Sequence, residues 1–269
     1  MTREILPVVI LCGGQGTRMY GGGAPRPKML VEVGEWPMLW HLMQIYAHYG
    51  HKQFILCLGY LGDQIRRYFL EYEVMHRDVT FRLGAPNGPK YHGQFRELDW
   101  EITFADTGAY TQTGARIRKI APYIKTERFF ATYGDGLGDV DLDALLAYHR
   151  SKGVIATLTA VRPRSQWGIV EVNAAGIVTG FRQKPHMEAW VNGGFFVFER
   201  GIFDYLQGDD ALELELEPFE RLVRDGQLAL YRHDGFWRAM DTFKDVEEVD
   251  ALWRAGDAPW KVWDQGAAR

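Results

Sequence analysis

The sequence predicts an α/β fold in which a mostly parallel, mixed sheet carries helices on both faces. The chain opens with the continuous apolar stretch ILPVVILC, which is typical of a strand buried on both sides of a parallel sheet. Stretches of helical and strand character then alternate through the first half, as in repeated β-α-β units. A glycine-rich segment follows the first strand directly, at the carboxyl end where open α/β sheets bind ligands.

The individual elements follow in order along the chain. Apolar residues at helical spacing, with Pro37 in the first turn and Gly50 just past the end, predict a helix over residues 36–50. Residues 168–185 predict a hairpin with NAAG as its turn. Further helices are expected at residues 63–70, 113–124, 141–153, 216–226 and 243–256, and further strands at residues 53–60, 100–108, 128–136, 154–161, 191–198 and 228–242.

Composition and charge limit the class of protein. The 269 residues suit one domain with an elaboration, and 46% apolar residues are ample for a core. A net charge of −4 argues against nucleic acid or a membrane surface as the main partner. Cys12 and Cys57 lie in apolar stretches and are expected to be reduced, without a disulfide. Without a signal peptide or an apolar run of about 20 residues, a cytoplasmic protein is expected.

The glycine-rich segment GGQGTR at residues 13–18 predicts a site for a polyphosphate. Glycine lets the backbone approach a ligand closely, and consecutive amides form an anion-binding nest. The segment matches neither the G-x-x-x-x-G-K-[ST] phosphate loop nor the dinucleotide pattern G-x-G-x-x-G, since Met19 takes the last glycine position of the latter. Arg18 and Lys28 would supply positive charge from outside the turn. The alternatives are an empty glycine turn and, for Lys28, a solvated surface lysine.

Two acids follow apolar strands and are candidate ligands of a magnesium ion. Asp135 lies between glycines in YGDG, and Asp241 lies in RAMDT. Magnesium takes one or two carboxylates together with phosphate oxygens and water. The alternative for each acid is a helix N-cap or an Asx turn, and the position just before Thr242 favours it most for Asp241. Lys184, in FRQKP, and the NGG segment at residues 192–194 would bind a second anion.

These clusters together indicate a reaction between two phosphates. Such transfers need positioning and charge neutralisation more than a protein nucleophile, because the acceptor phosphate is already ionised. The histidines, among them His41, His48 and His51, lack ligand spacing and are interpreted as structural or surface residues. The tryptophans of the last helix and tail are interpreted as packing or subunit contacts: Trp253, Trp260 and Trp263.

The motifs as a set resemble one known family over nearly the whole chain. They are LCGGQGTR, Lys28 before MLVEVG, WPMLWHLM, ADTG, TGARIRK, TYGDG, NGGFFVF, GFWRAMDT and LWRAGDAPWKVW. In this order and spacing they resemble the sugar-1-phosphate nucleotidyltransferases, and most of all their glucose-1-phosphate cytidylyltransferase branch. The resemblance implies a Rossmann-like nucleotide-binding core at approximately residues 1–162. Residues 163–269 would form a small β-rich, acceptor-binding and C-terminal elaboration of the same domain.

The resemblance also implies a reaction and a set of site residues. The reaction is transfer of CMP from CTP to a sugar 1-phosphate with Mg²⁺, giving a CDP-sugar and pyrophosphate, in an enzyme that is commonly a homo-oligomer. Catalytic roles fall on Arg18, Lys28 and Asp135, and metal binding falls on Asp135 and Asp241. The implied nucleotide site comprises Leu11, Cys12, Gly13, Gly14, Gln15, Gly16, Thr17, Arg18, Lys28, Thr107, Gly108, Thr113, Gly114 and Gly134. The implied acceptor site comprises Gln183, Lys184, Asn192, Gly193, Gly194 and Trp237.

The departures from the family pattern concern the acceptor and the segment before Lys28. Gln183 stands where the family usually has a glutamate that touches the sugar hydroxyls, and Gln166 and Trp167 replace an arginine and a phenylalanine. The glycines at 21–23 replace an acidic and polar segment and suggest a mobile lid. Glucose 1-phosphate is the acceptor that the resemblance implies, and because of these departures another sugar phosphate or a non-sugar phosphate is the alternative. A non-catalytic nucleotide sensor is a further alternative, although Lys28, Asp135 and Asp241 are all present.

Overall fold

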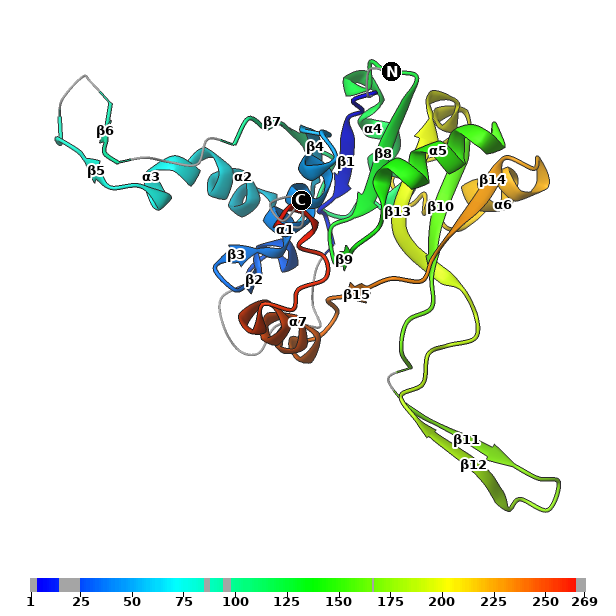
Figure 1. The fold of residues 1–269 in the computed structure, drawn as a ribbon. Helices are drawn as coiled ribbons and strands as arrows, with labels where there is room; N and C mark the ends of the chain where they lie inside the picture. The colour runs from blue at the N-terminus through cyan, green and yellow to red at the C-terminus, as the bar shows by residue number, and fades with distance from the viewer. Residues whose placement is uncertain (1–3, 15–24, 85–87, 94–97, 166, 265–269) are drawn as a thin grey trace.

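A central seven-stranded sheet organises the protein in a computed structural model, which describes residues 4–14, 25–84, 88–93, 98–165 and 167–264 (Figure 1). The strand order is β14-β10-β13-β8-β1-β4-β7. Strand β13 is antiparallel to both of its neighbours, and the other pairs are parallel, so the predicted mostly parallel, mixed sheet is confirmed. The strands are β1 (Val8–Leu11), β4 (Gln53–Leu58), β7 (Glu101–Asp106), β8 (Arg128–Tyr133), β10 (Ala156–Val161), β13 (Val191–Glu199) and β14 (Leu228–His233).

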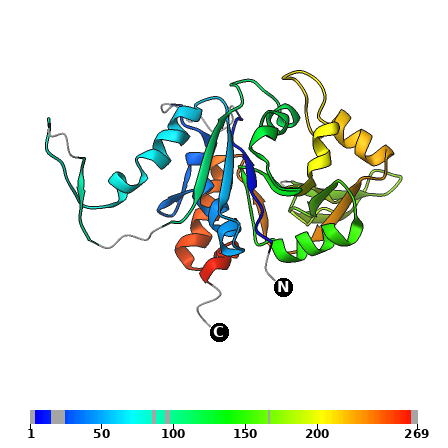
Figure 2. The same cartoon turned by 90° about the horizontal axis from the view of Figure 1, so that it is seen from above.

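Helices cover both faces of this sheet, as predicted (Figure 2). Alternate residues of β1 enter two different apolar cores: Val8 and Ile10 one, Val9 and Leu11 the other. The first core is closed by α1 (Met38–His48), α2 (Gly62–Leu70), α5 (Leu142–Lys152) and α7 (Phe243–Ala255), and the second by α4 (Thr113–Lys119) and α6 (Glu217–Arg224). Burial on both sides explains why the first strand is continuously apolar.

Small two-stranded units surround the main sheet. Strands β2 (Glu32–Val33) and β3 (Trp36–Pro37) pair before α1, and β9 (Gly136–Gly138) pairs with β15 (Trp237–Ala239). Two other units project from the body (Figure 1). One contains α3 (Tyr72–His76), β5 (Val79–Thr80) and β6 (Lys90–Tyr91), and the other is the hairpin of β11 (Gly168–Val172) and β12 (Val178–Gln183).

The expected hairpin at residues 168–185 is thus confirmed, with its turn at Asn173–Gly176, but the projecting unit of α3, β5 and β6 was not anticipated from the sequence. Residues 228–242 were expected as one strand and a loop; they form β14 and then the separate strand β15. Both cysteines are free and buried, as expected. Trp260 is fully buried beside His41, so it serves packing. No helix in the described part of the chain is long and apolar enough to cross a membrane.

Candidate active site

The glycine-rich segment leaves β1 at the carboxyl edge of the sheet. Cys12 continues the parallel pairing, since its amide donates to the Cys57 carbonyl at 3.1 Å. Gly13 follows, where a Cβ atom would lie 2.0 Å from the Arg116 guanidinium carbon, so only glycine fits. Gly14 is exposed with open space beside it. Gln15, Gly16, Thr17, Arg18 and the expected lid at 21–23 lie outside the described residues.

Arg116 of α4 is hydrogen-bonded to the glycine segment, and no pattern in the sequence indicated this role. Its side chain is buried and donates to the Gly13 carbonyl at 3.0 Å, to the Leu58 carbonyl at 3.0 Å and to the Thr107 hydroxyl at 2.6 Å. All three acceptors are neutral oxygens. Arg116 therefore ties the ends of β1 and β4 to the start of the segment after β7, and brings a positive charge to this edge of the sheet.

Lys28 lies between the two acids that were predicted to bind a metal. Its ammonium donates to Asp135 Oδ2 at 2.9 Å and to Asp241 Oδ1 at 2.8 Å. The side chain is 10% exposed, against 37% for Asp135 and 44% for Asp241. Burial lowers the pKa of Lys28, but the charge of Asp135 and hydrogen bonds to both carboxylates outweigh it, so the pKa is raised and the ammonium stays charged. The alternative of a solvated surface lysine is excluded.

Long-range pairing brings these three residues together, and we call them the Lys28 cluster. The 3₁₀ turn Lys28–Leu30 anchors Lys28 through buried Met29 and Leu30. Strand β15 pairs antiparallel with β9, and the Met240 amide donates to the Asp135 carbonyl at 2.8 Å, so Asp241 arrives beside Asp135. The N-cap of α7 is Thr242, which forms a capping box with Asp245. Asp241 is therefore not the cap that its alternative interpretation required.

The two carboxylates suit a divalent cation. Both place an oxygen within 2.9 Å of a single ammonium nitrogen, so both reach one positive centre. Oxygen ligands of this kind are those Mg²⁺ takes, one or two from the protein and the rest from phosphate and water. Within the described residues, no group of three or more histidine, cysteine or acidic residues could hold a metal by itself. The donor set thus fits an ion that shares its ligands with a phosphate.

The segment expected to recognise the base lies on the other side of Arg116. Thr107 is buried and donates to the Leu58 carbonyl at 2.7 Å. Gly108 has φ +98°, a left-handed conformation that favours glycine. Thr113 begins α4, and the buried Gly114 packs against the backbone near Leu212. These residues share one edge of the sheet with the glycine segment.

On the acceptor side, the structure brings together Tyr133 and three of the predicted residues of β13. Asn192 Nδ2 donates to the Tyr133 hydroxyl at 3.0 Å, and Asn192 Oδ1 accepts from the Gly194 amide at 3.0 Å. Trp237 Nε1 donates to the Gly193 carbonyl at 2.8 Å. Gly134 fits between Met29 and the Leu11 carbonyl, where a Cβ atom would meet both. Strand β13 thus lies against β8, the strand that leads into the turn with Asp135.

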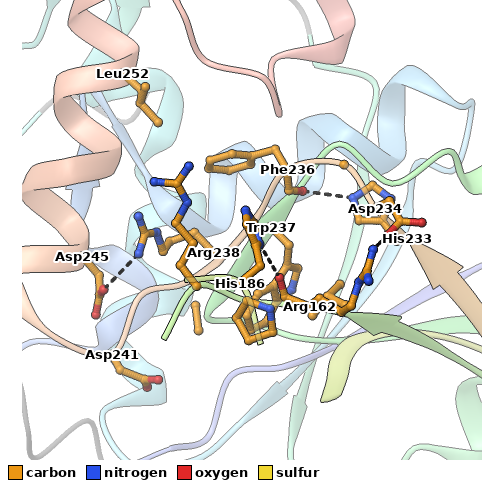
Figure 3. A pocket seen from close by; sticks show the side chains of 15 residues that line it. Arg162, His186, His233, Asp234, Phe236, Trp237, Arg238, Asp241, Asp245 and Leu252 are labelled. Atoms are coloured by element: carbon orange, nitrogen blue, oxygen red, sulfur yellow. Dashed lines mark hydrogen bonds and ion pairs between the residues drawn. The ribbon is translucent and has the colours of Figure 1, made fainter. Parts of the chain in front are cut away.

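A pocket of about 800 Å³ opens beside Asp241 and Trp237 (Figure 3). Its walls come from the segments that lead to and from the projecting hairpin and from the segment between β14 and α7. Arg162 pairs with Asp234 at 2.6 Å, while Arg164 has no ion pair within the described residues. The size is within the range of small-molecule sites. Further lining residues include Pro163, His186, His233, Phe236 and Arg238.

Gln183 and Lys184 lie apart from the Lys28 cluster. Gln183 ends β12 and Lys184 follows it with φ +48°, so both are at the base of the projecting hairpin (Figure 1). Both side chains are exposed, and neither makes a hydrogen bond or ion pair with the described residues. Trp167, at the other end of the hairpin base, is 74% exposed. The structure therefore unites the Lys28 cluster with residues 192–194 and Trp237, but not with Gln183 and Lys184.

The fold and the paired acids at the glycine segment define the class of protein. The profile of the nucleotidyl transferase family matches residues 7–258. The chain belongs to this family and is a nucleotidyltransferase. It is 44% identical to a protein of Bacillus subtilis (strain 168) named probable glucose-1-phosphate cytidylyltransferase, over 96% of this chain and 100% of that one.

Two other similarities extend this result. The glucose-1-phosphate cytidylyltransferase of Salmonella typhimurium is 41% identical, over 96% of this chain and all of its own length. Among solved structures, that of HddC from Yersinia pseudotuberculosis superposes with a TM-score of 0.67 at 18% identity, covering 93% of this chain and all of the other. The structural likeness supports the fold, and the two sequence relatives each cover 96% of this chain.

Proposed function

We propose that this protein transfers CMP from CTP to glucose 1-phosphate, giving CDP-glucose and pyrophosphate. The Lys28 cluster is the observation that carries the proposal, because it concentrates a charged ammonium and two carboxylates at the edge where the glycine segment leaves β1. The full-length relatives named as glucose-1-phosphate cytidylyltransferases at 41% and 44% identity support the choice of base and acceptor.

The reaction asks for positioning and charge neutralisation. A phosphate oxygen of glucose 1-phosphate attacks the α-phosphorus of CTP; the new P–O bond forms as the bond to the β-phosphate breaks, and pyrophosphate leaves. No proton need be removed from an ionised acceptor phosphate. Lys28 would stabilise the charge at the α-phosphate, and Arg18 the charge on the departing pyrophosphate. Asp135 and Asp241 would hold Mg²⁺, which supplies positive charge to the phosphate oxygens when bound.

The glycine segment and the neighbouring edge would hold the nucleotide. Gly13 and Gly14 would present amides to the triphosphate. Arg116 donates to the Gly13 carbonyl, and its hydrogen-bond acceptors among the described residues are neutral oxygens. The turn at Thr107–Gly108 and the start of α4 at Thr113–Gly114 would face the base. Backbone amides and carbonyls in these segments would supply hydrogen-bond donors and acceptors at fixed positions for the edge of a pyrimidine base.

The pocket beside Asp241 and Trp237 would hold the acceptor. It adjoins the Lys28 cluster, and its volume suits a sugar phosphate. A second candidate function is the same transfer to another phosphorylated acceptor. Gln183 favours this alternative, because the amide both donates and accepts hydrogen bonds where a carboxylate accepts only.

We also propose that the protein works as a homo-oligomer in the cytoplasm. Among the described residues, β11 and β12 form a sheet of two strands, and a two-stranded hairpin alone is marginally stable. Val170 and Phe181 are cross-strand partners on one of its faces and are 51% and 64% exposed. A second copy of the chain would cover this face, and in such an assembly the exposed Lys184 at the hairpin base would be close to a neighbouring subunit.

Light scattering after size exclusion tests the assembly. The wild-type chain should elute as an oligomer, and F181S should shift toward the monomer. As a matched control, V223S changes an exposed apolar residue of α6, 63% exposed, and should leave the mass unchanged. A monomeric wild-type protein would overturn this part of the proposal.

Pyrophosphate release tests the reaction. The assay contains CTP, Mg²⁺ and glucose 1-phosphate, with parallel reactions that replace the acceptor by mannose 1-phosphate, inositol 1-phosphate or glycerol 3-phosphate, or replace CTP by UTP. Efficient release with CTP and glucose 1-phosphate is the expected result. Release only with another acceptor would favour the second candidate function. CTP binding without release for any acceptor would indicate a nucleotide sensor and overturn the proposal.

A further inference from the structure

Glu215 lies in the segment before α6 and bonds to two distant elements through its two carboxylate oxygens. Oε1 accepts a hydrogen bond from the Tyr133 hydroxyl, and Oε2 accepts one from the Thr113 hydroxyl at 2.7 Å. Thr113 also accepts from the Leu214 amide at 2.9 Å. One carboxylate therefore joins the last residue of β8 to the first residue of α4.

These two partners belong to opposite halves of the site. Thr113 begins the helix whose N-terminal residues would face the base. Tyr133 precedes Asp135 by two residues, and its hydroxyl accepts from Asn192 on the acceptor-side strand β13. A continuous chain of hydrogen bonds thus runs from Thr113 through Glu215 and Tyr133 to Asn192 and the Gly194 amide.

The tyrosine in the middle of this chain has little freedom. Gly194 has φ +81°, and a Cβ atom there would lie 2.4 Å from the Tyr133 ring. The Tyr133 hydroxyl donates to Glu215 and accepts from Asn192, so both of its neighbours in the chain of hydrogen bonds are set. A rigid donor on each side fixes where the carboxylate can lie.

The segment that carries Glu215 does not depend on these bonds for its place. The Asp210 carboxylate accepts from Lys119 at 2.8 Å and from Thr111 at 3.2 Å, and the Asp210 carbonyl accepts from the Gln112 amide at 2.8 Å. Buried Leu214 anchors the segment in the second core. Removing the Glu215 carboxylate should therefore leave the fold in place and change the geometry of the site alone.

We propose that Glu215 is a positioning residue that sets the nucleotide half of the site against the acceptor half. The inference rests on the proposed function, because the two halves are its CTP and sugar-phosphate sites. Phosphoryl-type transfer requires attacking and leaving oxygens in line, and a misplacement of about 1 Å costs on the order of a hundredfold in rate. Glu215 acts through Thr113 and Tyr133 and need not touch either substrate.

The test compares E215A with E213A, a matched change at an exposed glutamate two residues away that has no hydrogen bond or ion pair with the described residues. Pyrophosphate release is measured at varied CTP and varied glucose 1-phosphate, and CTP affinity is measured separately by calorimetry without acceptor. For E215A we expect kcat to fall about tenfold to a hundredfold while the Kd for CTP changes less than about threefold. E213A should match the wild type, and E215Q, which still reaches both hydroxyls, should recover part of the loss.

Two further variants keep the proposal testable if E215A folds poorly. T113V and Y133F each remove one of the two bonds to Glu215, and the double variant should lose no more activity than E215A. E215A kinetics equal to those of E213A in an active enzyme would overturn the role of Glu215 alone. So would a loss of CTP affinity as large as the loss of kcat. No pyrophosphate release by the wild type with any acceptor would instead overturn the proposed function, and this role with it.

Discussion

Lys28 in the Lys28 cluster and Lys184 at the base of the projecting hairpin were both predicted to bind phosphate, yet their surroundings in the structure differ. Lys28 is 10% exposed and contacts two acids from distant parts of the chain. Lys184 is exposed and has no hydrogen bond or ion pair with the described residues. Lys28 is held in place by contacts within its own chain. Lys184 would need a neighbouring subunit or a bound substrate to gain a partner.

The difference follows from how each lysine is attached. Lys28 is held by buried Met29 and Leu30, and its acids are held by the pairing of β9 with β15. Lys184 follows a hairpin whose two strands, in the part of the chain that the structure describes, pair with each other and with no third strand. A site on sheet edges inherits the rigidity of the core, whereas a site on an isolated hairpin does not.

The largest effect is expected at the two acids of the Lys28 cluster. D135A and D241A should each lower kcat about a hundredfold to a thousandfold, because each removes a charge that would hold Mg²⁺ on the phosphates. Melting temperatures should stay within a few degrees, since both side chains are more than a third exposed. The measurement is pyrophosphate release together with thermal melting.

D99A is the matched control for these acids. Asp99 is an exposed carboxylate that also accepts from a lysine, Lys52, at 2.7 Å, but far from the cluster. Its removal should change neither kcat nor the metal requirement. Equal losses of melting temperature and activity in D135A would mean that the acid supports the fold, and the metal assignment would be wrong.

Arg116 should affect stability more than any residue of the hairpin. R116M would remove the donor that the Gly13 carbonyl has in Arg116, whereas the Leu58 carbonyl keeps the Thr107 amide and hydroxyl. The free energy of unfolding should fall by about 1–3 kcal/mol, the cost of one buried polar group left unsatisfied. F181S, on the hairpin, should cost the isolated subunit less than about 0.5 kcal/mol. Urea unfolding measures both, and a reversed order would contradict the comparison.

Acid should destabilise the body through His41. The side chain is fully buried, its Nε2 donates to the Val33 carbonyl at 2.9 Å, and its Nδ1 accepts from Trp260. Burial lowers the pKa of His41 from 6.5 to about 4. Below pH 6.5, His41 is protonated in the unfolded chain but stays neutral in the folded protein. Stability is therefore lost as pH falls from about 6.5 to about 4. The loss should reach about 3 kcal/mol.

Urea unfolding at pH 7.5 and pH 4.5 measures this dependence. H41N removes the titrating group and should flatten the pH profile, even though the variant is less stable at pH 7.5. H186A changes an exposed histidine at the hairpin base and should leave the profile of the wild type unchanged. If the free energy of unfolding of H41N falls with pH as steeply as that of the wild type, groups other than His41 cause the acid sensitivity.

Local patterns in the sequence were sufficient for the framework. Apolar periodicity placed β1, α1 and the later helices, and the NAAG turn placed the hairpin. Asp135 follows a strand of the parallel sheet, so its place at the carboxyl edge follows from sheet topology. These features depend on residues close in the sequence or on a general rule of sheet topology. The family resemblance, not a local pattern, implied that Lys28 and Asp241 belong to the same site.

The sequence did not indicate Arg116, Glu215 or the projecting unit of α3, β5 and β6. Arg116 acts on carbonyls 58 and 103 residues away, and Glu215 reaches Thr113 across 102 residues. No local pattern encodes such partners. One local signal accompanies Arg116: its neighbours in α4, Ala115 and Ile117, are buried with it. A charged residue among the buried positions of a helix requires hydrogen-bond acceptors.

The smallest effect is expected at Lys184, and it sharpens the comparison directly. K184A removes an exposed charge that would hold the acceptor phosphate, so the KM for glucose 1-phosphate should rise about tenfold while the KM for CTP stays within about twofold. K184R should keep most of the affinity, and K152A, an exposed lysine of α5, should change neither constant. The KM rise should shrink in F181S, because loss of assembly already removes the neighbouring subunit. An equal effect of K184A on CTP and acceptor would place Lys184 with the Lys28 cluster, and the contrast between the two lysines would fail.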